Sequence, residues 1–342
     1  MTRNYLITGG AGFIGSNYVA RLLQRGEQVT IFDNLSRAGA RRNLEWLREH
    51  FGDKSFKLVQ EDIRQAAAIR EAARDAEVII HLAAQVAVTT SVTDPRNDFE
   101  INALGAFNML EAARASRKKP IVLYASTNKV YGEMEDVPVV EKETRYDYER
   151  HPMGMAETQP LDFHSPYGCS KGCGDQYVRD YHRIYDLPTV VLRQSCIYGP
   201  RQFGIEDQGW VAWFVIAALT GRPISIYGDG KQVRDILYIE DLLDCYDLAV
   251  ANIDRSAGQV YNVGGGPDKT ISIWKEFSPI LEKNLGEPIP VKVSGWRPGD
   301  QKVYISDIRK AARDLGWSPK VTVEDGIARL FGWVGQHRHL FN

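Results

Sequence analysis

Residues 5–15 read Y-L-I-T-G-G-A-G-F-I-G, a short apolar run that ends at a cluster of glycines and leads into an amphipathic segment. Two glycine spacings overlap in it: Gly10-x-Gly12-x-x-Gly15 is the dinucleotide-binding fingerprint, and Gly9-x-x-Gly12-x-x-Gly15 is a variant of it. Without Cβ atoms, these residues permit a tight strand-to-helix turn, close approach of a pyrophosphate and close packing of the helix on the strand. The stretch therefore predicts a phosphate-binding loop at a helix N-terminus, with a purely structural glycine turn as the alternative.

An acidic residue at the end of the next predicted strand bears on the choice of dinucleotide. Residues 28–32 read as a strand, and Asp33 follows them. A carboxylate there accepts hydrogen bonds from both ribose hydroxyls of adenosine and repels a 2′-phosphate, which favours NAD over NADP. Arg37, Arg41 and Arg42 follow closely and could pair with a 2′-phosphate, so NADP is the alternative.

Strands and helices alternate along the first half of the chain. Further strands are predicted at residues 55–59, 76–82 and 121–126, and helices at residues 13–25 and 99–115. The run at 76–82 is largely apolar, as expected for a strand that is buried on both faces of a sheet. Because parallel strands need helical crossovers, this order predicts an α/β fold with a doubly wound parallel sheet.

The composition bounds the classes of function. Of 342 residues, 42 are basic and 44 acidic, and the net charge of −2 gives no sign of electrostatic binding to nucleic acid or to a membrane surface. The longest apolar run, residues 210–219, is too short to cross a bilayer, and the N-terminal region has no apolar stretch of signal-peptide length, so we predict a cytoplasmic protein. Four scattered cysteines without a second pair at zinc spacing favour free thiols and no metal site.

A second group of polar residues lies downstream of the predicted strand at 121–126. Tyr167 and Lys171 are four residues apart, hence on one face of a helix that starts near Pro166. Such a pair is common on protein surfaces. Here it follows a dinucleotide-binding pattern, with Thr127 just past the strand, and this context favours a catalytic pair over a surface contact.

Together these motifs resemble the extended short-chain dehydrogenase/reductase family of nucleotide-sugar-modifying enzymes, and the resemblance spans essentially the whole chain. Within the family, the sequence is most similar to the 2-epimerases that act on CDP-linked sugars. The stretches that carry the resemblance are residues 33–37, 85–87, 89–91, 98–102, 126–132, 161–172, 207–214, 230–235 and 315–319. Those at 127–132, 161–167 and 207–210 are the specific ones, because the glycine loop and the Tyr-x-x-x-Lys pair are common to the whole family.

The resemblance implies an activity and a cofactor. It implies a catalytic triad of Thr127, Tyr167 and Lys171, a NAD cofactor and a nucleotide-diphosphate sugar as substrate. Tyr167 would take the proton from the sugar C2 hydroxyl, with its pKa lowered by Lys171 and by the oxidised nicotinamide, while Thr127 would hold the reacting oxygen. Transient oxidation to a 2-keto sugar and hydride return to its opposite face would convert CDP-paratose to CDP-tyvelose.

The resemblance also implies a domain organisation and an assembly. A Rossmann domain that binds NAD is expected at residues 1–195, with a return segment at about 233–263. A smaller C-terminal domain at 196–342 would mainly bind the nucleotide sugar. Family members pair through the helices near residues 98–116 and 167–185, so we expect a homodimer or a homotetramer.

Individual contacts are assigned partly from the residues above and partly from the resemblance. Candidate cofactor contacts are Gly9, Gly12, Phe13, Ile14, Gly15, Asp33, Asn34, Ser36, Arg37, Asp62, Ile63, Leu82, Ala83, Ala84, Gln85, Asn102, Tyr167 and Lys171. Candidate substrate contacts are Thr89, Thr90, Ser91, Asn128, Lys129, His164, Gln194, Gln208, Trp210, Arg234, Arg297 and Asp300. Arg234 and Arg297 match family positions that bind the nucleotide phosphates, a task suited to a planar guanidinium.

Two departures from the family pattern bear on the substrate. The 4,6-dehydratases carry Asp-Glu after the catalytic threonine, whereas Asn128 and Lys129 offer no carboxyl group for water elimination. Cys196 stands where many relatives have an asparagine that binds the diphosphate, and a thiol is a poor donor. The alternatives left open are a 2-epimerase of GDP-glucose and GDP-mannose, a UDP-hexose 4-epimerase and, from a different class, a catalytically silent NAD-sensing protein.

Overall fold

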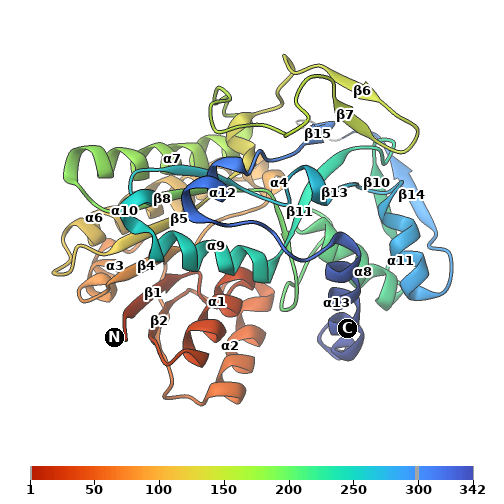
Figure 1. Ribbon diagram of the computed structural model, residues 1–342. Coiled ribbons are helices and arrows are strands. Elements are labelled where there is room, and N and C mark those ends of the chain that lie inside the picture. The colour runs from red at the N-terminus through yellow and green to blue at the C-terminus, as the bar shows by residue number, and fades with distance from the viewer. Residues whose placement is uncertain (1, 297–299, 342) are drawn as a thin grey trace.

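A seven-stranded parallel sheet forms the centre of the larger part of the molecule (Figure 1). The computed structural model describes residues 2–296 and 300–341. The strand order is β12-β8-β5-β4-β1-β2-β3, and every pair in it is parallel. The strands are β1 (Asn4–Thr8), β2 (Gln28–Phe32), β3 (Lys57–Val59), β4 (Val78–His81), β5 (Ile121–Thr127), β8 (Thr189–Gln194) and β12 (Val260–Val263). The strand order reverses between β1 and β4, which confirms the predicted doubly wound sheet.

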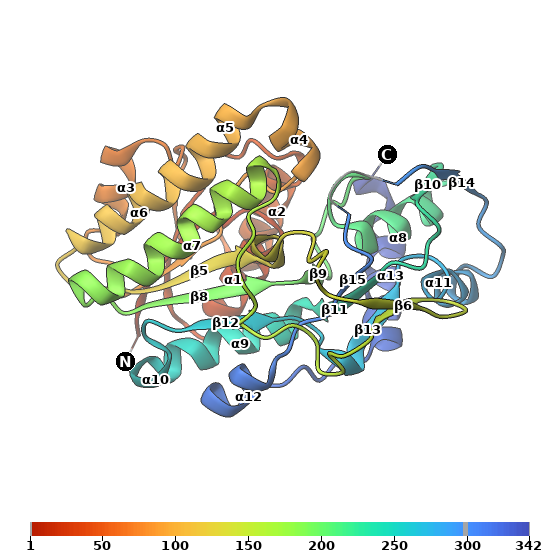
Figure 2. The same ribbon diagram turned by 90° about the horizontal axis from the view of Figure 1, so that it is seen from above.

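Helices cover both faces of this sheet (Figure 2). One face carries α3 (Ala66–Ala73), α6 (Gly105–Arg114) and α7 (Ser165–Tyr185), and the other carries α1 (Phe13–Gln24), α2 (Ala38–Phe51) and α9 (Ile239–Ala251). Successive residues of β1 explain the two layers, because Leu6 belongs to the core beneath α6 whereas Tyr5 and Ile7 belong to the core on the opposite face. Both faces of the central strands are therefore buried.

The helix predicted at residues 99–115 begins earlier, at Pro95, and changes type along its length. It consists of α5 (Pro95–Phe99), a π-helical turn η1 (Glu100–Leu104) and α6. A π turn adds one residue to the helical period, so apolar spacing alone does not reveal it. Strands β3 and β4 also begin later than predicted, because residues 55–56 and 76–77 lie in bends or irregular backbone before the paired segment.

A group of short strands lies beyond the carboxyl ends of β5 and β8 (Figure 2). After β8 the chain continues into β9 (Cys196–Tyr198), which pairs with β11 (Val233–Tyr238). Strand β11 also pairs with β13 (Thr270–Ser272) and β15 (Val303–Tyr304). Directly after β11 the chain returns through α9 to β12 in the large sheet. The domain limits at residue 195 and at 233–263 stay a prediction.

Smaller elements complete this part of the chain. Two-stranded sheets are formed by β6 (Val139–Glu141) with β7 (Tyr146–Tyr148) and by β10 (Ile224–Tyr227) with β14 (Val291–Ser294). The remaining helices are α4 (Val88–Thr93), α8 (Trp210–Thr220), α10 (Ile253–Ser256), α11 (Phe277–Leu285), α12 (Arg309–Leu315) and α13 (Val323–Gln336), with 3-10 turns η2 (Asn128–Tyr131), η3 (Pro267–Lys269) and η4 (Arg338–Leu340).

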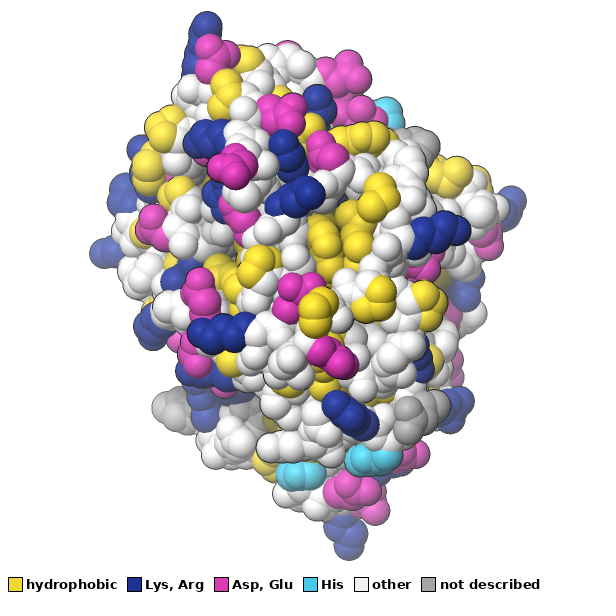
Figure 3. All heavy atoms as spheres, turned by 90° about the vertical axis from the view of Figure 1, so that its right-hand side faces the viewer, with side chains coloured by type: hydrophobic (Ala, Val, Ile, Leu, Met, Phe, Trp, Pro, Cys, Tyr) yellow, Lys and Arg dark blue, Asp and Glu magenta, His cyan; other side chains and the backbone are white. Residues whose placement is uncertain are grey.

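The surface carries mixed charge. On the face shown in Figure 3, basic and acidic side chains are interspersed and no broad field of one sign is visible.

Within residues 2–296 and 300–341, no helix is both long and apolar enough to pass through a bilayer. In the same described ranges no group of three or more His, Cys, Asp or Glu side chains could hold a metal ion, and Cys169, Cys173, Cys196 and Cys245 are free.

Candidate active site

A cavity of about 430 Å³ opens where strands β1, β2, β4 and β5 end. Its wall is formed by the glycine loop, by the residues after β2 and β4, by the first turns of α7 and by the loop at 201–208. The candidate cofactor contacts in this wall are Gly9, Gly12, Phe13, Ile14, Gly15, Asp33, Asn34, Ser36, Arg37, Asp62, Ile63, Leu82, Ala83, Ala84, Tyr167 and Lys171. Doubly wound sheets bind their ligands at this edge, where the strand order reverses.

The glycine loop is packed too closely to accept a side chain at several positions, and Gly15 and Gly9 are the tightest. A Cβ atom at Gly15 would lie 2.3 Å from the carbonyl oxygen of Gly9 and 2.6 Å from the Cα atom of Gly10. Gly9 has a φ of +69°, and a Cβ atom there would lie 2.7 Å from the backbone nitrogen of Ala83. Gly12 is the N-cap of α1 in the cavity wall, and no side chain caps the helix there. The uncapped N–H groups of this turn fit an anionic pyrophosphate.

Asp33 places a carboxylate in the cavity wall at the end of β2. It accepts hydrogen bonds from the backbone N–H groups of Ala11 at 3.0 Å and Leu35 at 2.8 Å, and burial raises its pKa. Each of the two bonds reaches a different carboxylate oxygen, so both oxygens retain a lone pair for a ribose hydroxyl.

Arginines near Asp33 differ in their placement. Arg37 lines the cavity and donates from Nη2 to the side-chain oxygen of Gln208, which joins the end of β2 to the loop before α8. Arg41 and Arg42 are not among the wall residues. On the same side of the cavity, hydrogen bonding from Arg64 holds the pKa of Asp62 at about 2.

The three predicted catalytic residues come from two neighbouring elements. Thr127 is the last residue of β5, and Tyr167 and Lys171 lie in the first turns of α7. Tyr167 and Lys171 line the cavity, whereas Thr127 is not among the wall residues and its hydroxyl donates to the Asn128 side-chain oxygen. The Lys171 Nζ atom donates to the carbonyl oxygen of Ala125 at 2.7 Å and lies 4.4 Å from the ring centroid of Tyr124.

Burial dominates the titration of these groups. It raises the pKa of Tyr167 to about 12, against the opposing effect of the Thr127 side chain. It lowers the pKa of Lys171 to about 8. Lys171 donates to a backbone carbonyl and not to the phenol oxygen, and the lowering of the Tyr167 pKa expected from Lys171 together with a bound oxidised nicotinamide stays a prediction.

Asn102 and Gln85 do not belong to the cavity wall, although both are candidate cofactor contacts. The Asn102 side chain accepts from the Gln85 N–H at 2.9 Å and donates to the Gln85 carbonyl oxygen, to Asp98 and to Ser170. It thereby ties the loop after β4 to α7. Asp98 and Ser170 are buried members of this network; both lie in stretches that carry the family resemblance, but neither was predicted as a site residue.

The candidate sugar contacts fall into two groups. Gln194 and Gln208 line the cavity. Thr89 and Thr90 are exposed on α4, and His164 is exposed and lies 3.0 Å from a Glu133 carboxylate oxygen.

Ser91 is buried and engaged with the backbone. Its hydroxyl donates to the carbonyl oxygen of Val88 at 2.7 Å and accepts from the N–H of Tyr167 at 3.1 Å. The observed contacts of Ser91 are thus those of a residue that supports the start of α7.

Another polar cluster joins η2 to the short strands. The Arg234 guanidinium donates to Asp300 at 2.7 Å, and the Lys129 Nζ atom lies 3.4 Å from the side-chain oxygen of Gln301. Burial and the neighbouring Arg234 lower the pKa of Lys129 to about 8. Arg297 lies outside the described residues.

Trp210, Cys196 and Asn128 lie at the borders of this cluster. The Trp210 indole N–H points to the Cys196 sulfur at 3.4 Å, so the thiol acts as an acceptor. Asn128 is buried, and its side-chain oxygen accepts a hydrogen bond from Thr127 at 3.3 Å.

Sequence reasoning missed one side of the cavity. The loop that forms it supplies Arg201, Gln202, Phe203, Gly204 and Ile205 to the wall. This loop has no motif spacing that links it to the glycine loop, so only its position in the fold reveals the contact.

Comparisons with known proteins agree with this geometry. Residues 6–330 match the family described as GDP-mannose 4,6-dehydratase. The chain is 43% identical to the CDP-paratose 2-epimerase of Salmonella typhi over 336 residues, which covers 96% of this chain and 98% of that protein.

Solved structures extend the comparison. The UDP-glucose 4-epimerase of Thermotoga maritima, solved with UDP-glucose, superposes with a TM-score of 0.83 at 30% identity, covering 98% of this chain and 99% of that one. The dTDP-glucose 4,6-dehydratase of Streptomyces venezuelae, solved with NAD, has a TM-score of 0.83 at 30% identity and 98% coverage of both chains. The chain therefore belongs to the extended short-chain dehydrogenase/reductase family of nucleotide-sugar epimerases and dehydratases.

Proposed function

We propose that the protein is a NAD-dependent epimerase that inverts C2 of a nucleotide-linked hexose, converting CDP-paratose to CDP-tyvelose through a transient 2-keto sugar. One observation carries the proposal. Tyr167 and Lys171 line the same cavity as the glycine loop, and the two residues that follow Thr127, Asn128 and Lys129, have no carboxyl group. The 43% identity to a CDP-paratose 2-epimerase supports C2 as the reacting carbon and CDP as the nucleotide.

The cavity fits the proposed cofactor. The uncapped N-terminus of α1 would hold the pyrophosphate, and the free lone pairs of Asp33 would accept the adenosine ribose hydroxyls. NAD, when bound there, supplies the acceptor and the donor of hydride.

The side chains at the end of β5 and the start of α7 would transfer the proton of the sugar C2 hydroxyl. Tyr167 would take the proton of the sugar C2 hydroxyl and later return it to the same oxygen. Lys171 would favour the phenolate through its positive charge, and Thr127 would hydrogen-bond the reacting oxygen. Because the proton and the oxidation state of the sugar are restored in each cycle, the net reaction is an isomerisation.

The residues after Thr127 argue against a dehydratase. Elimination of water from a hexose needs an acid and a base, which a carboxyl pair supplies in the dehydratase relatives. Asn128 has no titratable group, and its side-chain oxygen already accepts from Thr127. Lys129 lies beside Arg234, which makes this part of the site suited to the substrate diphosphate.

The function can be tested with the purified protein and no added cofactor. Incubation with CDP-paratose, GDP-glucose and UDP-glucose in deuterated buffer, followed by NMR, should show inversion at C2 of CDP-paratose without deuterium at that carbon. Deuterium at C2 would show that the hydride is not returned internally. Inversion at C4 would favour the UDP-hexose 4-epimerase, and turnover of GDP-glucose would favour the GDP-linked 2-epimerase. Failure of all three sugars would leave the silent NAD-sensing protein.

Replacing Asp33 with alanine should weaken the retention of NAD, because the ribose hydroxyls lose their acceptor. A charged-group hydrogen bond contributes about 1.5–3 kcal/mol, so the dissociation constant should rise by about one to two orders of magnitude. Fluorescence titration with NAD measures the change. Asp53→Ala removes an exposed carboxylate and serves as the control. An unchanged dissociation constant in Asp33→Ala would contradict the ribose contact.

We further propose that the chain forms a homodimer or homotetramer through α5, η1, α6 and α7. These elements expose large apolar side chains that monomeric surfaces seldom cluster, namely Phe99, Leu104, Phe107, Tyr177, Ile184 and Tyr185. Phe107 and Tyr177 pack edge to face with ring centroids 6.0 Å apart, which joins the two helices into one surface.

The assembly has a direct test. Phe107→Glu places a charge at the centre of the proposed interface and should convert the protein to monomers in analytical ultracentrifugation. Val293→Glu, which alters an exposed apolar side chain on β14, is the matched control and should leave the mass unchanged. An oligomer that survives Phe107→Glu would contradict this interface.

A further inference from the structure

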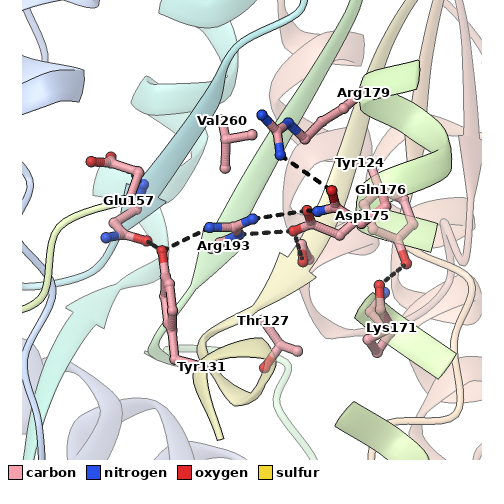
Figure 4. A network of polar contacts seen from close by, with 12 residues as sticks. Tyr124, Thr127, Tyr131, Glu157, Lys171, Asp175, Gln176, Arg179, Arg193 and Val260 are labelled. Atoms are coloured by element: carbon pink, nitrogen blue, oxygen red, sulfur yellow. Dashed lines mark hydrogen bonds and ion pairs between the residues drawn. The ribbon is translucent and has the colours of Figure 1, made fainter. Parts of the chain in front are cut away.

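A buried ion pair lies between helix α7, which carries Tyr167 and Lys171, and the large sheet (Figure 4). Asp175 on α7 is 0% exposed and Arg193 on β8 is 2% exposed. Arg193 donates from Nε and Nη2 to the two carboxylate oxygens of Asp175, at 2.9 and 3.0 Å. Neither residue belongs to the cavity wall, and the proposed chemistry uses neither of them.

The Asp175 carboxylate joins the two elements that carry the candidate catalytic residues, and its partner Arg193 ties them to the neighbouring strand β8. Asp175 lies one helical turn after Lys171 on α7, so both side chains leave the helix on the same side. Ser126 precedes Thr127 on β5, and its hydroxyl donates to Asp175 at 2.7 Å. The Asp175 carboxylate therefore connects the helix that carries Lys171 directly to the strand that ends at Thr127.

The network also holds the turn on the other side of Thr127. Arg193 donates from Nη1 to the hydroxyl of Tyr131 at 3.0 Å, and Tyr131 donates to the side-chain oxygen of Asn262 on β12 at 2.7 Å. Tyr131 is the last residue of η2, which begins directly after Thr127. Thr127 is thus flanked by two residues that bond to the same ion pair.

Stability alone is a weak reason for this arrangement. Removing two charges from water costs several kcal/mol per ion, and replacing a buried ion pair by apolar groups is often neutral or stabilising. A bidentate contact between a guanidinium and a carboxylate is directional, however, and apolar packing is not. Gly174 allows α7 to lie so close to β5 that a Cβ atom there would lie 2.3 Å from the Tyr124 hydroxyl oxygen. The directional ion pair then fixes the position of α7 relative to β5, where the two elements pack closely at Gly174.

The charge of Asp175 also acts on the Lys171 ammonium. The titratable and charged groups that face Lys171 are Asp175 and Tyr167 on α7, Asp98 on α5, Tyr124 on β5 and His81 on β4. His81 is neutral, because burial lowers its pKa to about 3. Burial also lowers the pKa of Lys171, and Asp175 and Asp98 are the groups that oppose this effect.

We infer that Asp175 and Arg193 are positioning residues of the candidate active site: their ion pair sets where the Lys171 ammonium and the Tyr167 hydroxyl lie relative to Thr127. The inference rests on the proposed function only in assigning chemistry to those three residues. It predicts that removing either member changes Lys171 in a direction that depends on which charge is lost.

The first test needs no substrate. Lysine labelled with 13C at Cε is titrated by NMR in the full-length protein, and Lys171→Met assigns the resonance. Asp175→Asn removes a negative charge that raises the Lys171 pKa, so Lys171 should lose its proton at lower pH than in the unmodified protein. Arg193→Met leaves a carboxylate that still accepts from Ser126 and Gln176, so Lys171 should keep its proton to higher pH. Identical Lys171 titrations in all three proteins would overturn the inference.

The second test separates position from charge. The double variant Asp175→Asn/Arg193→Met removes both charges and should lower kcat about tenfold to 100-fold with KM for the sugar nearly unchanged, because small misplacements of reacting groups have effects of this size. Arg193→Lys keeps the charge but loses the bidentate contact, so it should restore the Lys171 titration and recover only part of kcat. Unmodified kcat in the double variant would overturn the positioning role.

Two readouts keep these outcomes distinct. Thermal unfolding and dinucleotide content show whether each variant is folded, and Arg193→Lys decides the question if the double variant is not. Opposite Lys171 shifts without turnover of any sugar would support the positioning role while refuting the proposed function. Turnover of CDP-paratose with unshifted Lys171 titrations would support the proposed function and refute the positioning role.

Discussion

Replacing Tyr167 with phenylalanine is expected to lower kcat by at least about two orders of magnitude, the usual size of a lost general base. The Tyr167 side chain is buried against the cavity, and phenylalanine fills nearly the same space without the oxygen that accepts the C2 hydroxyl proton. The backbone N–H of residue 167 would still donate to Ser91, so the start of α7 should stay in place. Dinucleotide binding should therefore persist, and steady-state kinetics with absorbance of the bound nucleotide measures both quantities.

A second tyrosine on the same helix provides the control. Tyr177 lies on α7 outside the cavity wall, and Tyr177→Phe keeps the ring that packs on Phe107 in the proposed interface, so kcat should stay within a factor of about two. Turnover near that of the unmodified enzyme in Tyr167→Phe would rule out the base. Loss of the dinucleotide in the same variant would instead place Tyr167 among the groups that bind the cofactor.

Gly15→Ala is expected to weaken cofactor binding as strongly as the loss of the Asp33 carboxylate. The new Cβ atom would lie 2.3 Å from the Gly9 carbonyl oxygen and 2.6 Å from the Gly10 Cα atom, and both are backbone atoms of the loop itself. Relief of this overlap requires the loop to move away from α1, at a cost of about 1–3 kcal/mol. The N–H groups that face the pyrophosphate move with it, so NAD affinity should fall by about one to two orders of magnitude, as isothermal titration can measure.

Another helical glycine shows what the same substitution does where there is space. Gly332 lies on α13, where nothing stands within 4 Å of an added Cβ atom, so Gly332→Ala should be neutral or slightly stabilising. Unchanged NAD affinity in Gly15→Ala would contradict the role of this loop, and the pyrophosphate-binding site would then have to be assigned to other residues.

Most of the large sheet was predictable from sequence because its signals are local. Glycines at 9, 12 and 15 lie between an apolar run and an amphipathic one, and β2 was predicted with the bounds that the structure has. The π turn η1 was not predictable, because its extra residue changes the helical period without changing the apolar pattern. Asn102 lies in that turn, and its side chain bonds to the backbone of Gln85.

The site was predictable in part for the same reason. Tyr167 and Lys171 share a helical face by their spacing, and both line the cavity. Ser91 was expected to contact the sugar, but the structure shows it bonded to Val88 and to the Tyr167 backbone. Its sequence neighbours do not reveal this, since the start of α7 is far from Ser91 along the chain.

The sequence by itself determined the dinucleotide loop, the acidic residue after β2, the alternation that makes a parallel sheet and the spacing of the tyrosine and the lysine. These properties depend on residues a few positions apart, where helix and strand periods decide which side chains share a face. Only the tertiary structure decided that the loop at 201–208 closes the cavity and that Asp175 meets Arg193 behind it. Such contacts depend on the strand order and on the direction of each side chain, and local spacing encodes neither.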